Sequence, residues 1–377
     1  MNKTKIHIVS FDIPYPANYG GAIDVYYKVK NLSEAGCEVY LHCYEYGDRT
    51  PQPILDQYCK QVWYYKRQTG LSGLSTTKPY IVSSRKGEEL LANLLSVDAA
   101  ILFEGVHTTY YLSHPALRDR LKLVRTQNVE QEYYRGLMGK ATSLVSKAYF
   151  AVEAALLSVY ENKMTAADAF LTVSLYDQRF FADKYPGIPA YFIPSFHSYN
   201  SVAVMPGIGD FCLYHANLGH PENREVLQFL LQEVVPYSNM RFVIAGRNAA
   251  PATINRCKEL TNCTLINNPE DAEMHRLIHE AHIHVLPTFQ ESGIKLKLLS
   301  SLFGGRHILV NKSMLFGTDF SNVCHIAETG KEFAAMINKL ATIPITQSDI
   351  ENRTNALMKY TNSVNAQKII DILNKGK

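Results

Sequence analysis

The sequence of 377 residues predicts an α/β protein made of two doubly wound domains, each with a parallel sheet. Short apolar runs that resemble buried strands alternate with helical patterns, which is typical of parallel sheets covered on both faces. The alternation forms two series, separated by turn-forming residues around 194–210. The length also exceeds one average hydrophobic core and suits two domains.

Composition excludes several classes of protein. Hydrophobic residues make up 46% and charged residues 19%, which is a globular composition rather than a disordered one. The net charge of +3 is too small to indicate a nucleic-acid partner. No apolar run approaches the roughly 18 residues of a membrane span, and the run at 6–11 is too short for a signal peptide. We therefore expect a cytoplasmic protein.

Cysteine usage agrees with that location. The seven cysteines are odd in number, scattered, and without a C-x-x-C pair. The pattern predicts free thiols and disfavours a disulfide framework or a zinc site.

The elements follow in order. The first series predicts strands at 6–13, 38–44, 98–103, 121–126, 169–174 and 190–193, and the second at 211–216, 240–245, 283–287 and 307–311. Helical patterns lie at 21–35, 145–166, 221–232, 270–281, 294–304, 331–341 and 349–375. We therefore expect an N-terminal domain over 1–200, a C-terminal domain over 201–348 and a final helix within 349–377.

The segment 143–164 carries apolar residues at helical spacing, among them Leu144, Val145, Val152 and Val159. A helix lying on a membrane surface would show this pattern. An amphipathic helix packed on the core would also show it, and we favour the core interpretation.

Ligands of open parallel sheets bind beyond the carboxyl ends of the strands. The first such loop ends in Gly20 and Gly21 and opens a helix, so the backbone there could approach a ligand closely. A plain tight turn would also use two glycines. The dinucleotide pattern G-x-G-x-x-G follows none of the predicted strands, which disfavours a nicotinamide enzyme.

The loop after the strand at 283–287 is the most informative. An apolar stripe over 294–302 predicts a helix that starts near Ser292 and Gly293. Lys295 and Lys297 fall near its first turn, where each cation opposes the helix dipole by about 0.3–1 kcal/mol. A bound diphosphate would explain both lysines. Two solvent-exposed lysines without a ligand would give the same sequence pattern.

Polar residues follow other strands. Arg247 follows the strand at 240–245. Its guanidinium could bind a phosphate in a bidentate manner, or it could be an ordinary surface arginine. In the first half, Glu104 and His107 follow the strand at 98–103, and Asn128 and Glu130 follow the strand at 121–126. These residue types suit acid, base or hydroxyl-binding roles, and His107 is equally compatible with an ordinary loop histidine.

Together, several motifs resemble retaining glycosyltransferases of family 4, which have the GT-B fold. The resemblance covers nearly the whole chain, and the segment 292–299 is its most specific part. The motifs are the Gly20-Gly21 loop, the segments 127–135 and 219–223, Ala245-Gly246-Arg247, and the segment 292–299 followed by Gly304-Gly305-Arg306.

The resemblance implies two Rossmann-like domains that face a cleft, with the last helix crossing back to the N-terminal domain. The C-terminal domain would bind a UDP- or GDP-linked sugar, and the N-terminal domain a glycan or lipid-linked acceptor in cell-surface polysaccharide synthesis. Transfer would retain configuration and would need no metal or further cofactor. Peripheral contact with the inner face of the membrane is an option, because relatives that act on lipid carriers are peripheral proteins.

The resemblance also implies residue roles. Arg247 and the turn at 292–297 would hold the diphosphate, with the backbone amides of Gly293 and Ile294 facing donor oxygens. Either Glu291 or Ser292 would approach the sugar hydroxyls.

On the acceptor side, His107 would lie near the reacting sugar. Glu104 and Glu130 are the nearest candidates for a base or a hydroxyl-binding group.

The sequence departs from the family at one position. The family has a second glutamate, eight residues after the first, that holds the ribose; here that position is Leu299 or Ser300. Ser300 offers one neutral hydrogen bond, about half as strong as one to a carboxylate. This departure leaves open an inactive GT-B protein that acts as a binding partner. A GT-B enzyme of another reaction type, such as a nucleotide-sugar epimerase, is a further alternative.

Overall fold

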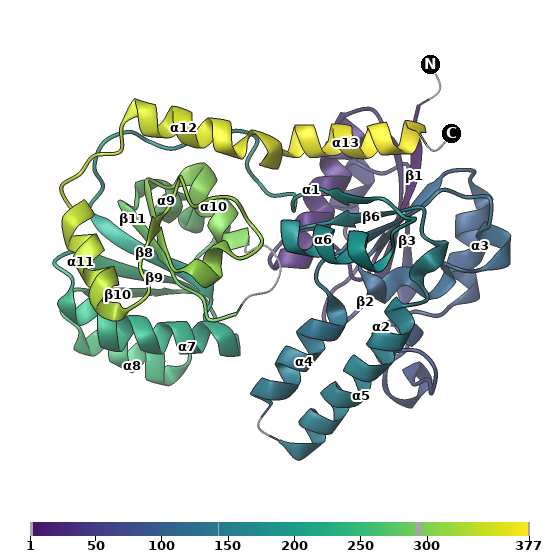
Figure 1. Ribbon diagram of the computed structural model, residues 1–377, viewed down its shortest axis with the longest axis horizontal. Helices are drawn as coiled ribbons and strands as arrows, with labels where there is room; N and C mark the ends of the chain where they lie inside the picture. Colours follow the sequence, from purple (N-terminus) through teal and green to yellow (C-terminus); the bar gives the residue numbers. More distant parts are fainter. Residues whose placement is uncertain (1–2, 142, 291–295, 376–377) are drawn as a thin grey trace. The chain divides into compact units, whose positions relative to one another are not determined.

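The computed structural model describes residues 3–141, 143–290 and 296–375. The chain forms two compact units. The first contains the residues up to Phe196 together with those from Asn362 onward, and the second runs from His197 to Thr361. Each unit is built on one parallel sheet (Figure 1).

Within the described residues, the sheet of the first unit has seven parallel strands in the order β3-β2-β1-β4-β5-β6-β7. The strands are β1 (Lys5–Ser10), β2 (Glu38–Glu45), β3 (Gln61–Lys66), β4 (Ala100–Glu104), β5 (Lys122–Thr126), β6 (Ala169–Thr172) and β7 (Ala190–Phe192). The helices are α1 (Gly20–Glu34), α2 (Tyr80–Ser83), α3 (Glu88–Ser96), α4 (Glu130–Lys140), α5 (Leu144–Glu161), α6 (Leu175–Lys184) and α13 (Asn362–Lys375).

This sheet is buried on both faces because its strands carry apolar residues on both. Ile8 of β1 packs in a cluster with residues of α1 and α13, including Val29 and Ile369. The next residue, Val9, points to the other face and packs in a cluster with residues of α3, α5 and α6, including Phe181. The C-terminal helix α13 is thus part of the core of the N-terminal unit.

The sheet of the second unit has six parallel strands among the residues described, in the order β10-β9-β8-β11-β12-β13. The strands are β8 (Phe211–Asn217), β9 (Arg241–Arg247), β10 (Cys263–Asn267), β11 (Ile283–Leu286), β12 (His307–Val310) and β13 (His325–Ile326). The helices are α7 (Pro221–Phe229), α8 (Pro251–Glu259), α9 (Asp271–Glu280), α10 (Leu296–Gly304), α11 (Gly330–Leu340) and α12 (Gln347–Leu357).

The predicted α/β class with two parallel sheets is confirmed, and every predicted strand is present. Three strands were missed: β3, β10 and β13. The single helix predicted over 349–375 is wrong. The chain there forms α12 in the second unit and α13 in the first, with a short turn at Met358–Tyr360 between them.

The core interpretation of the segment 143–164 is also wrong for most of its apolar residues. Helices α4 and α5 lie side by side as a hairpin (Figure 1). The buried face of α5 is formed by Glu153, Ala154, Leu157 and Glu161. The predicted apolar residues lie on the other side, with exposed fractions of 84% for Leu144, 81% for Val145, 59% for Val152 and 53% for Val159.

Two expectations about composition can be compared with the structure. Among the described residues, no helix combines the length and the apolar character that crossing a membrane requires. All seven cysteines are free thiols, and four of them are buried.

Candidate functional site

The carboxyl edge of the second sheet gathers polar side chains from four strands. Asn217 ends β8, Arg247 ends β9, Thr288 follows β11, and Asn311 follows β12. Parallel strands of one sheet present these ends along the same edge. Residues that are up to 94 positions apart therefore become neighbours.

Two buried side chains fix the loop after β11. Asn311 Oδ1 accepts a hydrogen bond from the backbone N–H of Thr288 at 3.0 Å, and Asn311 Nδ2 donates to Thr288 O at 2.7 Å. The Thr288 hydroxyl then donates to Glu222 Oε1, on the first turn of α7, at 2.6 Å. The loop that leads into residues 291–295 is therefore held at its start.

Lys297 lies on the first described turn of α10 and reaches toward the same helix α7. Its ammonium donates to Asn223 Oδ1 at 3.3 Å and lies 5.2 Å from the centre of the Tyr214 ring. Asn223 in turn donates to the backbone carbonyl of Asn217 at 2.9 Å. An ammonium held by an amide oxygen and an aromatic face is positioned to attract an anion.

Arg247 lies at the surface of this edge. Its side chain is 44% exposed and its guanidinium is 3.5 Å from the carboxylate of Asp271, which is itself exposed. A pair of this kind is weak and easily exchanged. The backbone around it is constrained, because Asn248 has a left-handed φ of 61° and a Cβ at Gly246 would overlap the carbonyl oxygen of Ala216.

Five predicted donor-side residues lie outside the described residues: Glu291, Ser292, Gly293, Ile294 and Lys295. The apolar stripe that follows them is confirmed, since Leu298, Leu299, Leu302 and Phe303 are all fully buried. Complete burial of Leu299 leaves Ser300, half-buried on α10, as the polar side chain of that pair.

The carboxyl edge of the first sheet brings together the predicted Gly21 and His107. A Cβ at Gly21 would overlap Cζ of Phe11, which follows β1, and the Phe11 and His107 ring centres lie 5.6 Å apart. Gly105 has a left-handed φ of 71°, and a Cβ there would lie 2.8 Å from His107 Nδ1. The two loops thus meet through Phe11. Gly20 is exposed at the start of α1.

Two arginines, Arg85 and Arg67, lie near Phe11 and His107. The buried Arg85 guanidinium donates to the carbonyl of Phe11 at 2.9 Å and to that of Ile81 at 2.6 Å. Burial, with Arg67 nearby, lowers the pKa of Arg85 to about 9. Burial and these two arginines hold the pKa of His107 well below its usual value, so this imidazole is neutral near pH 7. Its Nδ1 has no hydrogen-bond partner among the described residues.

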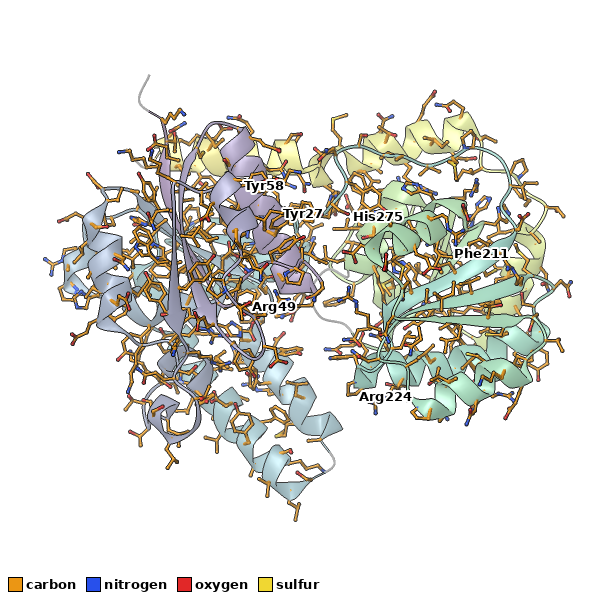
Figure 2. All side chains as sticks on the ribbon, turned by 180° about the vertical axis from the view of Figure 1, so that it is seen from behind. Tyr27, Arg49, Tyr58, Phe211, Arg224 and His275 are labelled. Atoms are coloured by element: carbon orange, nitrogen blue, oxygen red, sulfur yellow. The ribbon has the colours of Figure 1, made fainter. Side chains whose placement is uncertain are left out.

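Asp12 completes the edge. Its carboxylate accepts from the Tyr19 hydroxyl at 2.7 Å and lies 3.4 Å from Nε of Arg49. Figure 2 labels the Arg49 side chain in the first unit. Burial raises the pKa of Asp12, although the Tyr19 hydrogen bond opposes the shift. The Arg49 guanidinium also lies 4.8 Å from the Tyr19 ring centre. Sequence analysis did not single out Asp12, Arg49 or Arg85, which become neighbours only through the fold.

Glu104 belongs to a buried charge network rather than to an open edge. Its Oε1 accepts from Lys28 at 2.6 Å, and Lys28 also binds Asp24 at 3.1 Å. Arg125 of β5 binds both Asp24 oxygens, at 2.9 and 3.1 Å. All four side chains are fully buried. Burial raises the pKa of Glu104, whereas Arg125 and Lys28 outweigh burial at Asp24 and hold its pKa low.

Glu130 lies in a second, acidic cluster at the start of α4. Burial, and then Glu161 and Asp177, raise its pKa to about 8, while a hydrogen bond from Asn128 opposes the shift. Burial also raises the pKa of Asp177 to about 7. Glu130 is therefore largely protonated near pH 7 and can donate a hydrogen bond. Among the described residues, no hydrogen bond or ion pair connects the side chains of Glu104, His107 and Glu130 to one another.

No metal centre is evident in the described part of the chain. Among residues 3–141, 143–290 and 296–375, no three His, Cys, Asp or Glu side chains form a group that could hold a metal ion.

Comparison with known proteins gives one related sequence and many related folds. No known family profile matches the chain. An uncharacterized 44.6 kDa protein from the cps region of Klebsiella pneumoniae is 27% identical over 324 residues, which is 79% of this chain and 80% of that protein.

Solved structures resemble the chain over its full length. A trehalose-6-phosphate synthase has a TM-score of 0.65 at 10% identity and covers 98% of this chain and 99% of its own. A glycosyltransferase from Rickettsia africae has a TM-score of 0.64 at 12% identity, covering 100% and 99%. Anabaena HepE, solved with UDP and glucose, has a TM-score of 0.60 at 13% identity, covering 99% and 100%. The chain has the GT-B fold.

Proposed function

We propose that the protein is a glycosyltransferase that moves a sugar from a nucleotide-sugar donor, linked to UDP or GDP, to a glycan or lipid-linked acceptor. The donor binds the second unit and the acceptor binds the first. The cps-region relative supports a role in surface polysaccharide synthesis in the bacterial cytoplasm. Neighbours of the same fold were solved with UDP and glucose or with UDP-rhamnose, which supports a nucleotide-sugar donor.

The observation that carries the proposal is the position of Lys297 at the carboxyl edge of the second sheet. In the transfer, the bond from the sugar C1 to the diphosphate oxygen breaks while C1 bonds to an acceptor hydroxyl oxygen, whose proton passes to the leaving diphosphate. Negative charge grows on the leaving diphosphate. Lys297 is held beside Asn223 and Tyr214 and would stabilise that charge, with Arg247 as a second cation.

The turn 291–295 would add backbone N–H groups and the side chains of Glu291, Ser292 and Lys295. We propose no metal in this step, because these cations and amides take the role that a metal has elsewhere. Retention of configuration is part of the proposal and rests on the motif resemblance.

On the acceptor side, a neutral His107 would hydrogen-bond the reacting sugar or the acceptor hydroxyl. Gly20 and Gly21 would let the acceptor approach the backbone, and Asn128 would orient Glu130. Glu104 would fix the end of β4, where the loop of His107 starts, through its buried bond to Lys28.

A catalytically inactive binding partner is the second candidate. It is favoured by the absence of a carboxylate at Leu299 or Ser300, since Leu299 is fully buried. In such a protein the GT-B fold would present a surface without turning over a sugar.

Thermal shift against UDP, GDP, ADP and their common sugar conjugates tests the donor site. A ligand at 100 times its Kd stabilises the folded protein by about 2.7 kcal/mol. We expect one nucleotide to raise the Tm, and the shift to shrink in Lys297→Ala but not in Lys258→Ala, an exposed lysine on α8.

The outcomes separate the two candidates. A nucleotide shift followed by sugar release or transfer supports the enzyme. No shift with any nucleotide at millimolar concentration supports the inactive partner. Nuclear magnetic resonance of the product anomer then decides between retention and inversion.

A further inference from the structure

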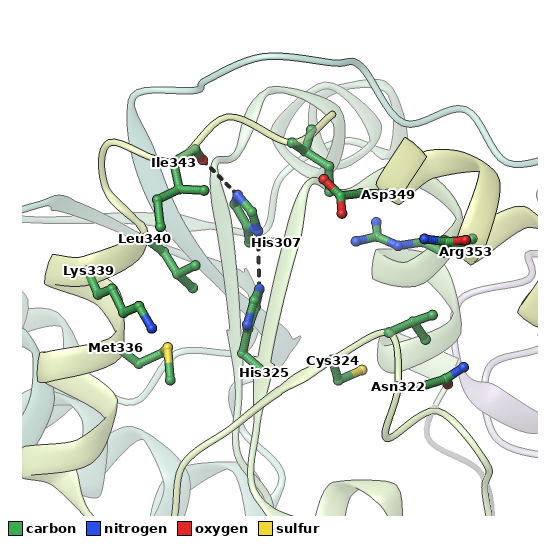
Figure 3. A pocket seen from close by; sticks show the side chains of 13 residues that line it. His307, Asn322, Cys324, His325, Met336, Lys339, Leu340, Ile343, Asp349 and Arg353 are labelled. Atoms are coloured by element: carbon green, nitrogen blue, oxygen red, sulfur yellow. Dashed lines mark hydrogen bonds between the residues drawn. The ribbon is translucent and has the colours of Figure 1, made fainter. Parts of the chain in front are cut away.

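A pocket of about 420 Å³ opens in the second unit, away from the carboxyl edge (Figure 3). His307, which begins β12, lines it, and so does His325, which begins β13. Because the strands are parallel, the start of β12 lies at the edge opposite to Asn311. Lys339 of α11 and Arg353 of α12 complete the basic part of the lining.

Arg353 is buried without an ion pair among the described residues, although the charge of Asp349 acts on it at longer range. It is only 4% exposed, and its two terminal nitrogens donate to the carbonyl oxygens of Gly305 and Arg306. Its Nε–H has no acceptor among the described residues, and none of their carboxylates forms an ion pair with it. Neutral carbonyls orient a guanidinium but do not neutralise it, so the charge remains available to an anion.

Asp349 is the acidic side chain of the lining. Its Oδ2 accepts from the N–H of Thr346 at 2.9 Å and from the Thr346 hydroxyl at 2.6 Å, as part of the cap of α12. These hydrogen bonds lower the pKa of Asp349. The lining thus holds this one carboxylate and two basic side chains, Arg353 and Lys339.

The two histidines form a directed pair. His307 Nε2 lies 2.8 Å from the carbonyl oxygen of Ile343, which can only accept, so this nitrogen carries the proton. His307 Nδ1 is then the acceptor for His325 Nε2, 3.2 Å away. In the neutral pair, Nδ1 of His325 is therefore unprotonated. A proton added there creates a new donor without breaking either existing bond.

We propose that this pocket binds the phosphate group of a small phosphorylated molecule, at a site separate from the carboxyl edge of the sheet. Figure 3 shows Lys339 and Arg353 on opposite sides, with the histidine pair between them. Donors from several directions suit the tetrahedral oxygens of phosphate better than the flat pair of a carboxylate. The rest of the molecule has room against Leu340 and Ile343, which also line the pocket.

The site would also communicate with α10. Arg353 holds the carbonyl of Gly305, and the N–H of Gly305 donates to Ser301 O, near the end of α10, at 2.7 Å. This helix carries Lys297 at its other end. The binding proposal itself does not depend on the proposed transferase activity.

Calorimetric titration of the full-length protein with inorganic phosphate tests the site. We expect binding that weakens at least fivefold in Lys339→Gln and changes less than twofold in Lys331→Gln, a control at an exposed lysine earlier on α11. The same titration in a Lys297→Ala background should still show this binding, because phosphate captured at the carboxyl edge would be lost there. Absence of phosphate binding, or equal binding by Lys339→Gln and wild type, would overturn the proposal.

Sulfate supplies a second readout, because its charge stays constant between pH 6 and 8. The groups that face His325 are His307 of β12, Lys339 of α11, and Asp349 and Arg353 of α12. Burial, together with Arg353 and Lys339, lowers the pKa of His325, and a bound anion opposes that shift. We therefore expect sulfate to bind more tightly at pH 6 than at pH 8 in wild type, and this pH dependence to shrink in His325→Gln. An unchanged pH dependence in that variant would contradict the part assigned to the histidine pair.

Discussion

Substitution of Asp24 by asparagine removes the centre of the buried charge network in the first unit. Among the described residues, Asp24 accepts five hydrogen bonds: from Lys28, from Gln127, from the N–H of Phe196 and two from Arg125. The amide of asparagine keeps one acceptor oxygen and turns the other position into a donor. Whichever way the amide is oriented, at least two of the five bonds become donor-to-donor contacts.

The charge balance of this network determines how much unfolding free energy Asp24→Asn removes. Lys28 and Arg125 are now matched by Asp24 and Glu104, and Asp24→Asn leaves one positive charge unmatched in a fully buried site. Removing one partner of a buried ion pair costs about 3–5 kcal/mol. With a slope of about 2 kcal/mol per molar urea, the unfolding midpoint should fall by roughly 2 M.

The assay can be confined to the first unit, because the single tryptophan, Trp63, lies on β3 and stacks on His42 at 4.6 Å. Its fluorescence during urea unfolding reports on that unit. Asp98→Asn is the matched control, since Asp98 pairs with Arg120 at the surface and its side chain is 98% exposed. The control should cost less than about 1 kcal/mol. A midpoint for Asp24→Asn within about 0.5 M of the control would refute the assigned role of the network.

Three further predictions concern function, pH and membrane contact. Lys297→Ala should keep the fold and lower turnover at least tenfold in a transfer assay; unchanged turnover would remove Lys297 from the site. Glu130 has a pKa of about 8 when folded, above its unfolded value near 4.5, so its contribution to stability is complete below pH 4.5 and is lost as the pH rises through 8. Urea midpoints from pH 5 to 9 should therefore fall less steeply in Glu130→Gln, and an identical slope would contradict this. If the exposed face of α5 docks on membranes, Val145→Glu with Val152→Glu should reduce sedimentation with anionic vesicles, whereas Leu71→Glu, at an exposed apolar residue outside α5, should not.

The central strands could be predicted from the sequence, and most edge strands could not. The missed strands β3, β10 and β13 all lie at sheet edges. A strand buried on both faces must be apolar throughout, so runs such as 100–103 stand out. An edge strand such as β10 is only partly buried, and its mixed polar and apolar composition resembles that of a loop.

The candidate site was predictable only where a local signal exists. The position of Lys297 near the start of a helix is such a signal, and the structure places this residue beside Asn223 and Tyr214. The roles of Asp24 and Arg353 could not be predicted, because their partners lie up to 172 and 48 residues away in the sequence. On a helical pattern, both residues look like ordinary solvent-facing charges.

The same limit explains why the buried face of α5 was predicted wrongly. Helical spacing shows that one side of the helix is apolar but not which side faces the protein. Here the buried side contains Glu153 and Glu161, which bind the N–H of Tyr80 and the amide of Gln131.

The place of α13 in the core of the first unit affects how the protein folds during synthesis. This helix supplies Ala366, Ile369 and Leu373 to the cluster that also contains residues of β1 and α1. The ribosome makes the entire second unit before it makes this helix. The first unit therefore waits, with an apolar face of its sheet partly uncovered, while about 165 residues are translated, and at 5–20 residues per second that delay lasts on the order of 10–30 s. Chaperone dependence in the cell should consequently fall on the N-terminal half of the chain, although that half is made first.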